Sequence, residues 1–139
     1  MDPVHELSGM LRARLRTDTA ISAFVGNRIY DEPPSGTVTS PYISMGSYSA
    51  TTDDADCIDG LEITFQIDCW SWAAADGGAE VRKIAGAIRK NLHDSDFSLT
   101  TNALASISHR ITRFQREPDK AGEILSRAII TVTALVEAA

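Results

Sequence analysis

The segment from Leu61 to Cys69 alternates strictly between apolar and polar residues, and it constrains the fold more than any other part of the chain. Every odd position is apolar and every even position is polar. A period of two is typical of a β-strand with one face on a hydrophobic core and the other toward solvent. We therefore predict a strand here, with Glu62 and Asp68 on its solvent-facing side.

A helix is predicted directly after this strand. Asp76, Gly77 and Gly78 interrupt the extended pattern, and apolar residues then recur at helical spacing. A helix with one apolar stripe needs a sheet to pack against, so the rest of the chain must provide partner strands. The residues of the stripe are Val81, Ile84, Ala85, Ile88 and Leu92.

The remaining elements are predicted from apolar spacing and from turn residues. Their order predicts an α+β fold, with an antiparallel sheet of about four main strands and helices packed mainly on one face. A chain of 139 residues fits a single domain, residues 1–139. The predicted elements are helices over 3–16 and 19–25, strands over 28–31, 42–48 and 97–99, and a C-terminal hairpin with strands over 104–116 and 123–136.

Residues 49–60 form a polar, acidic segment at the end of a predicted hairpin. Asp53, Asp54 and Asp56 lie among threonines in it. The spacing does not fit a calcium-binding EF-hand, because Ile58 and Asp59 occupy positions where a ligand and a glycine are required. We therefore expect a solvated hairpin end and not a calcium site.

A second charged segment lies at the C-terminal hairpin. Arg113, Arg116 and Lys120 lie in or beside its turn, residues 117–122. Charged hairpin ends without apolar residues have little to pack against in their own domain. We expect these basic residues to pair with the acidic residues of a neighbouring subunit or of a partner ring.

The last predicted strand has an outer face that is unusually apolar for a surface in water. Leu125, Ile129 and Leu135 alternate there with Thr131 and Thr133. Such a face is typical of a surface that a partner covers. Leu125 and Ile129 are therefore candidate interface residues.

Trp70 and Trp72 end the alternating strand and do not fit its pattern. Trp70 follows the inward-facing Cys69, so either a bulge redirects it or its ring points to the polar side. One interpretation makes it an anchor for helix packing. The other makes it an anchor on a partner subunit, because tryptophan is enriched in binding hot spots.

No motif for catalysis, metal binding or cofactor binding is present. His5, His93 and His109 are not spaced as metal ligands, and Cys57 and Cys69 are expected to be unpaired thiols. The formal net charge of -6 disfavours direct nucleic-acid binding. No apolar run approaches the ~18 residues of a membrane span, and no secretory signal is recognised. We expect a soluble, cytoplasmic, non-enzymatic protein without cofactor or metal.

Several short motifs, in their order, resemble the small tail-completion proteins of long-tailed phages. The resemblance implies a tail terminator, a structural virion protein that forms a ring, usually of six copies, which caps the tail tube and ends its polymerisation. The motifs are Phe24-Val25-Gly26, Arg28-Ile29-Tyr30-Asp31, Pro41-Tyr42-Ile43-Ser44-Met45-Gly46, Trp70-Ser71, the helix over 81–92 and the C-terminal hairpin.

The resemblance also implies partners and a location. The partners would be further copies of the chain, the tail tube protein and the head connector or stopper protein, with DNA passing through the ring without specific binding. The protein would remain in the host cytoplasm during assembly. It would then lie at the head-proximal end of the tail, in a phage or in a gene transfer agent.

Two other functions stay open at this point. A neck or connector subunit on the head side of the joint would share these sequence features. A small dimeric α+β domain that binds a ligand or catalyses a simple reaction would need polar residues converging between sheet and helices. The inward face of the strand over 61–69 is apolar, which argues against that alternative.

Overall fold

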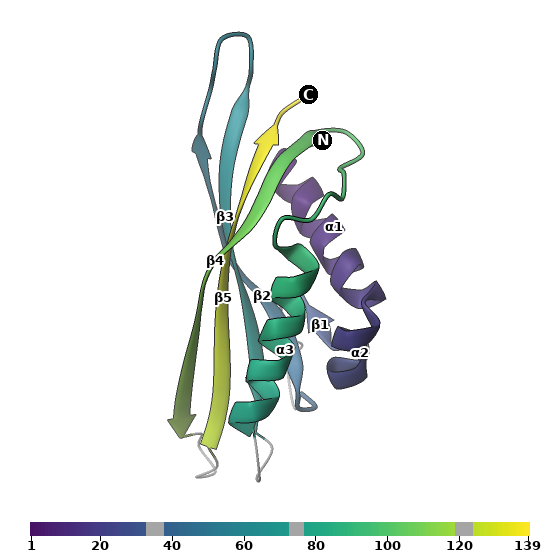
Figure 1. Cartoon of the computed structure of the whole chain (residues 1–139), viewed down its shortest axis with the longest axis vertical. Helices are drawn as coiled ribbons and strands as arrows, with labels where there is room; N and C mark the ends of the chain where they lie inside the picture. Colours follow the sequence, from purple (N-terminus) through teal and green to yellow (C-terminus); the bar gives the residue numbers. More distant parts are fainter. Residues whose placement is uncertain (33–37, 73–76, 119–123) are drawn as a thin grey trace.

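One five-stranded sheet and three helices form the part of the chain that the structure, a computed structural model, describes: residues 1–32, 38–72, 77–118 and 124–139 (Figure 1). The predicted α+β class is confirmed, with one strand more than expected. In chain order the elements are α1 (Pro3–Thr17), α2 (Thr19–Val25), β1 (Ile29–Tyr30), β2 (Tyr42–Thr52), β3 (Gly60–Ser71), α3 (Gly77–Leu92), β4 (Ala103–Pro118) and β5 (Ile124–Glu137).

The sheet has the strand order β1-β2-β3-β5-β4. Every pair of neighbours is antiparallel except β1 and β2, which are parallel. The two edges differ, because β1 has 2 residues whereas β4 has 16. The long strand β4 therefore pairs with β5 on one side only, and its other edge has no strand partner among the described residues.

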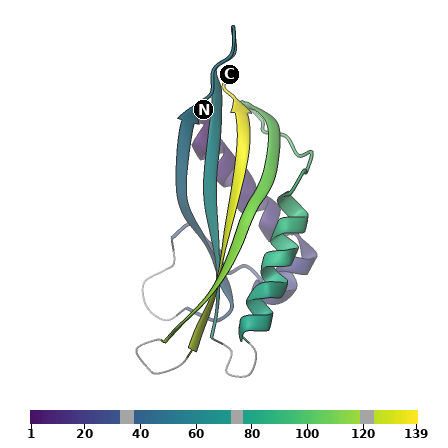
Figure 2. The same cartoon turned by 60° about the vertical axis from the view of Figure 1, so that its left-hand side comes forward.

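The centre of the sheet is β3, which pairs with β2 on one side and with β5 on the other. Ile63, Phe65, Ile67 and Cys69 are buried on one of its faces, as the alternation predicts. All three helices lie on that side of the twisted sheet (Figure 2). The apolar stripe of α3, from Val81 to Leu92, is buried there too.

The two N-terminal helices are defined by their ends. The Asp2 carboxylate caps α1 by accepting a hydrogen bond from the His5 amide, at 2.9 Å. Asp18 caps α2 in the same way, and Gly26 ends α2 with a φ of 58°. None of the three helices in the described part of the chain is long and apolar enough to cross a membrane.

One predicted boundary and one predicted strand are wrong. The strand β2 does not stop at Tyr48 but continues to Thr52, because β3 offers it ladder partners as far as Leu61. Residues 97–99 form no strand. Instead, Leu99 is buried, and Phe97 packs against the core with the Arg14 guanidinium over its ring. The apolar residues of this segment are thus buried without strand pairing.

Glu6 joins the first helix to the segment before β4. Its side chain is 6% exposed, and its two carboxylate oxygens accept hydrogen bonds from the Thr101 and Asn102 amides, each at 2.8 Å. The Asn102 side chain in turn accepts a hydrogen bond from the Ala139 amide at 2.9 Å. The hydrogen bond from the Asn102 backbone lowers the pKa of Glu6; burial acts in the opposite direction, and the Thr101 backbone lowers the pKa further.

This arrangement predicts a pH dependence of stability. A carboxylate whose folded-state pKa is lowered stabilises the fold above its ordinary pKa, here 4.5, and the stabilisation is lost as the pH falls through the folded value. We expect Glu6→Gln to lower the thermal unfolding midpoint near pH 7 and to flatten its decrease below about pH 5. Glu62→Gln, at an exposed carboxylate, is the control. Equal pH dependence in wild type and Glu6→Gln would contradict this role.

Candidate assembly surfaces

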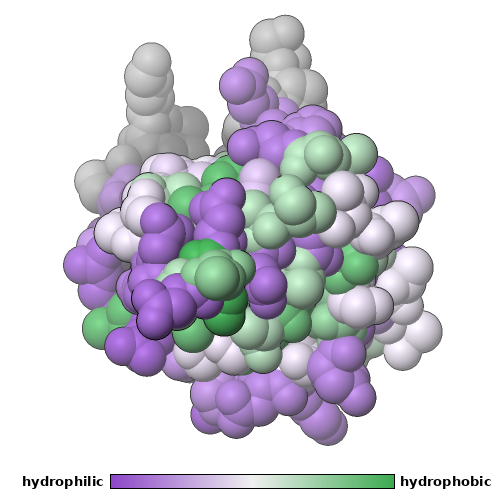
Figure 3. Space-filling view, turned by 90° about the horizontal axis from the view of Figure 1, so that it is seen from above, coloured by the Kyte–Doolittle hydropathy of each residue, from purple (hydrophilic) through white to green (hydrophobic). Residues whose placement is uncertain are grey.

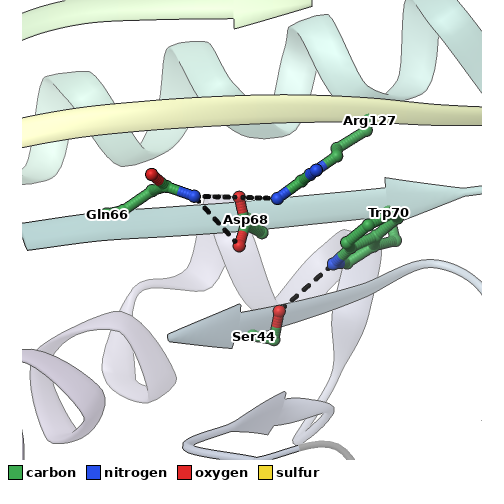
Figure 4. A network of polar contacts seen from close by, with 5 residues as sticks. All are labelled: Ser44, Gln66, Asp68, Trp70 and Arg127. Carbon is green, nitrogen blue, oxygen red and sulfur yellow. Dashed lines mark hydrogen bonds and ion pairs between the residues drawn. The ribbon is translucent and has the colours of Figure 1, made fainter. Parts of the chain in front are cut away.

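Trp70 lies on the sheet face opposite the helices (Figure 4). It pairs directly with Tyr42 of β2 and Arg127 of β5, so no bulge redirects it. The Trp70 ring stacks on the Tyr42 ring with centroids 6.3 Å apart. The Arg127 guanidinium lies 4.5 Å from the Trp70 ring centroid, and the Trp70 Nε1–H donates to the Ser44 hydroxyl at 3.1 Å. The interpretation as an anchor for helix packing is therefore wrong.

Trp72 follows the last residue of β3 and is half-buried. Its ring meets the Tyr42 ring edge-on at 5.9 Å, and its amide donates to the Ser40 hydroxyl at 3.1 Å. The centroid of the Tyr30 ring lies 6.1 Å from that of the Tyr42 ring. An aromatic cluster thus forms at this end of β2 and β3, and sequence reasoning missed Tyr42 at its centre because its partners are distant in sequence.

Asp68 was predicted to face solvent, and the structure corrects this. It lies on the outer face but is only 6% exposed. Arg127 approaches one of its oxygens at 3.2 Å, and the Gln66 amide donates to the same oxygen at 3.2 Å (Figure 4). Strand pairing brings Arg127 beside it, and this neighbour could not be inferred from the local alternation.

The outer face of β5 is less exposed than predicted. Ile129 is 4% exposed, because it lies in the ladder between Asp68 of β3 and Arg113 of β4, and Leu125 is half-buried. The more exposed apolar residue on this face is Ile111 of β4, at 49%. The chain thus shields part of the surface that we expected a partner to cover.

The acidic hairpin end forms a closed turn that projects from the sheet (Figure 1). Asp53, Asp54 and Asp56 are all exposed. The Asp54 carboxylate accepts a hydrogen bond from the Gly60 amide at 3.1 Å, which links the two ends of the turn. Seen from this end, hydrophilic side chains cover much of the surface, with smaller hydrophobic groups among them (Figure 3).

The predicted basic residues lie at the other end of the molecule, toward the end of β4 (Figure 1). Arg113 and Arg116 are both exposed, while Lys120 falls outside the described residues. Arg113 lies on the outer sheet face and Arg116 lies on the helix side, next to Gly78 of α3. The acidic and basic residues are thus too far apart to pair within one chain.

Two of the histidines, His93 and His109, lie close together in the fold, which sequence reasoning missed. The His109 amide of β4 donates to His93 Nδ1 at 3.0 Å, and the two rings meet edge-on at 6.5 Å. Burial, with the nearby Arg89, lowers the pKa of His109. Among the described residues, no group of three or more His, Cys, Asp or Glu side chains could hold a metal ion.

A hollow beside the histidines, of ≈ 560 Å³, lies between α2 and the end of α3. Its polar groups already bind one another: Arg14 donates to the Asn91 side chain at 2.8 Å, and Asn91 donates to Asp18 at 2.7 Å. These contacts hold α1, α2 and α3 together. They are structural hydrogen bonds, and they do not resemble a nucleophile with its base.

A sheet with one covered face, one uncovered face and a long free edge is typical of a domain that assembles with other chains. The model of the family "Tail completion protein gp17" matches residues 9–137 of this sequence. The chain therefore belongs to this family of phage tail structural proteins.

Solved structures include a chain of the same fold. A chain from the virion of a native gene transfer agent particle is similar to this one with a TM-score of 0.82 and 23% sequence identity, over 96% of each chain. At this identity the similarity establishes a shared fold. Among curated proteins, none matches the sequence.

The Asp68–Arg127 pair predicts a measurable effect on stability. Asp68→Ala leaves the Arg127 guanidinium without its partner, and we expect it to lower the free energy of unfolding by about 1–3 kcal/mol. Glu62→Ala is the matched control, since Glu62 is exposed on the same face of β3. Urea unfolding measures both variants, and equal small effects would show that the pair contributes nothing.

Proposed function

We propose that this protein is a tail terminator that forms a ring of six copies on the end of the tail tube. The ring stops polymerisation of the tube and joins it to the head connector or stopper protein. This role is more specific than the family membership, which spans residues 9–137. The protein stays in the host cytoplasm during assembly and then lies at the head-proximal end of the tail.

The observation that carries the proposal is the one-sided construction of the sheet. Three helices cover one face, whereas the other face and the 16-residue edge of β4 have no covering element in the described ranges. An unpaired edge of this length would invite aggregation unless a partner covers it. Assembly with further copies and with tail proteins supplies such partners.

The charge of the chain agrees with passage of DNA through the ring. Its formal net charge is -6, which disfavours retention of a phosphate backbone. DNA therefore passes without specific binding. No catalytic step is proposed, because the hydrogen bonds among the described polar side chains join elements of the fold.

Ring formation is tested by the mass of the native protein. We expect a species near six times 15.0 kDa, or its appearance once tail tube protein is added. Electron microscopy of the mixture should show tubes capped at one end and shorter than uncapped tubes. A monomer under both conditions would exclude the ring. A ring that binds the head connector but never the tube would favour a subunit on the head side.

The absence of a catalytic role is tested with single alanine variants. We expect variants at His5, His93, His109, Asp54 and Cys69 to cap tubes as wild type does, or to lose capping only in proportion to lost stability. The measurements are tube capping and thermal unfolding of each variant. A folded, ring-forming variant that loses all function through one such change would contradict the proposal.

A further inference from the structure

Opposite ends of the molecule carry unpaired charges of opposite sign. In the described ranges, Arg127 pairs with Asp68, and His93 Nε2 lies 3.2 Å from the Asp94 carboxylate. Neither pair uses the carboxylates at the β2–β3 turn or the arginines near the end of β4. Since these groups lie at the two ends of the long axis (Figure 1), only another molecule can bring them together.

The basic end contains a pocket of ≈ 370 Å³, here called the foot pocket. A nitrogen of Arg82 and a nitrogen of Arg116 each lie 3.3 Å from the position that a Cβ on Gly78 would occupy. The two guanidinium groups therefore lie close together over a glycine that leaves room for them. Residues lining the pocket include Gly78, Val81, Arg82, Phe114, Gln115 and Arg116.

The foot pocket also has an apolar wall. Phe114 is 48% exposed although it lies on the helix side of β4. An exposed aromatic ring beside two arginines that form no ion pair within the described ranges is typical of a surface that receives an apolar side chain flanked by carboxylates. Sequence reasoning missed Arg82 and Phe114 because the helix and the strand meet only in the fold.

The acidic end presents that combination. The turn over residues 53–59, here called the acidic tip, exposes Asp53 and Asp56 on either side of its centre. Ile58, two residues after Asp56, is 42% exposed. Backbone hydrogen bonds between Ala55 and Ile58, at 2.9 and 3.2 Å, hold the tip closed, so its side chains are displayed on a defined turn.

We infer that the acidic tip of one copy binds in the foot pocket of a second copy of this chain. Asp53 and Asp56 meet Arg82 and Arg116, and Ile58 packs on Phe114. The inference rests on the proposed ring and specifies the contact between its subunits. A second copy is the occupant that the chain itself supports, because it carries both complementary surfaces.

The placement of the two surfaces fixes the kind of contact. Each copy gives a tip and receives one, which is a heterologous interface, and such interfaces close into a ring when the rotation between neighbours allows it. Neighbouring subunits must be inclined so that the tip of one reaches the foot of the next. The contact then links every subunit of the ring to two others.

The native cysteines allow a direct test by disulfide cross-linking. Cys57 is exposed on the acidic tip, whereas Cys69 is buried and will not compete. With Phe114→Cys in the foot pocket, at a side chain on the helix side of β4, we expect oxidation of the assembled ring to give a ladder of linked species from dimer upward. Cys57→Ser in the same background should abolish the ladder. Ser98→Cys, at an exposed position elsewhere, is the matched control and should give no ladder.

Charge reversal provides an independent measurement. We expect Arg82→Glu with Arg116→Glu to weaken subunit association about tenfold or more, and Asp53→Lys with Asp56→Lys in the same chain to restore it. Arg110→Glu with Asp96→Lys, at exposed positions outside both surfaces, should have no such effect. Circular dichroism shows that each variant is folded.

The outcomes separate this inference from the proposed function. Rings that cap tubes, but that give no ladder and tolerate the charge reversal, would overturn the contact and leave the terminator role intact. Cross-linking that stops at a dimer would also overturn it, because each copy must both give and receive a tip. A ladder only after tube or connector protein is added, linked to that protein, would assign the foot pocket to that partner. Failure of every variant and of wild type to form rings would remove both proposals.

Discussion

The packing of α3 on the inner face of β3 and β5 is the interaction on which the rest of the structure depends. Phe65 and Ile67 of β3, Ile130 of β5 and Ile84 of α3 are all at most 1% exposed. Burial of such side chains contributes about 1.5–3 kcal/mol each, so this layer dominates the stabilising terms. The remaining helices extend the same layer over β1 and β2, and all apolar burial by helices therefore occurs on one side of the sheet.

The one-sided layer leaves the outer face to be stabilised by side chains of the sheet itself. Arg127 contacts two side chains on this face: it pairs with Asp68 and lies over the ring of Trp70. The Asp68 carboxylate is buried on this face, and an unpaired buried charge would be strongly destabilising. Arg127 supplies its partner. Side chains that are already held by such contacts lose less conformational entropy when a partner binds.

The distribution of charge follows from the same architecture. Long antiparallel strands place the β2–β3 turn and the end of β4 at opposite ends of the sheet. Carboxylates and arginines that would neutralise each other in a compact arrangement are thus held apart within one chain. Attraction between unlike ends then acts between molecules, which favours an ordered orientation of neighbouring copies over random association.

The sequence by itself determined the α+β class, the central strand and α3, because the alternation from Leu61 to Cys69 and the stripe through Ile84 and Ile88 are periodicities of local burial. It also determined the C-terminal hairpin and the absence of a recognised catalytic motif. Only the tertiary structure decided on which face Trp70 lies, why Asp68 is buried and which residues form the foot pocket. These features depend on which strands become neighbours, and Arg127 and Asp68 are 59 residues apart in the chain. No local pattern carries that information, since strand order is settled by the packing of the whole sheet.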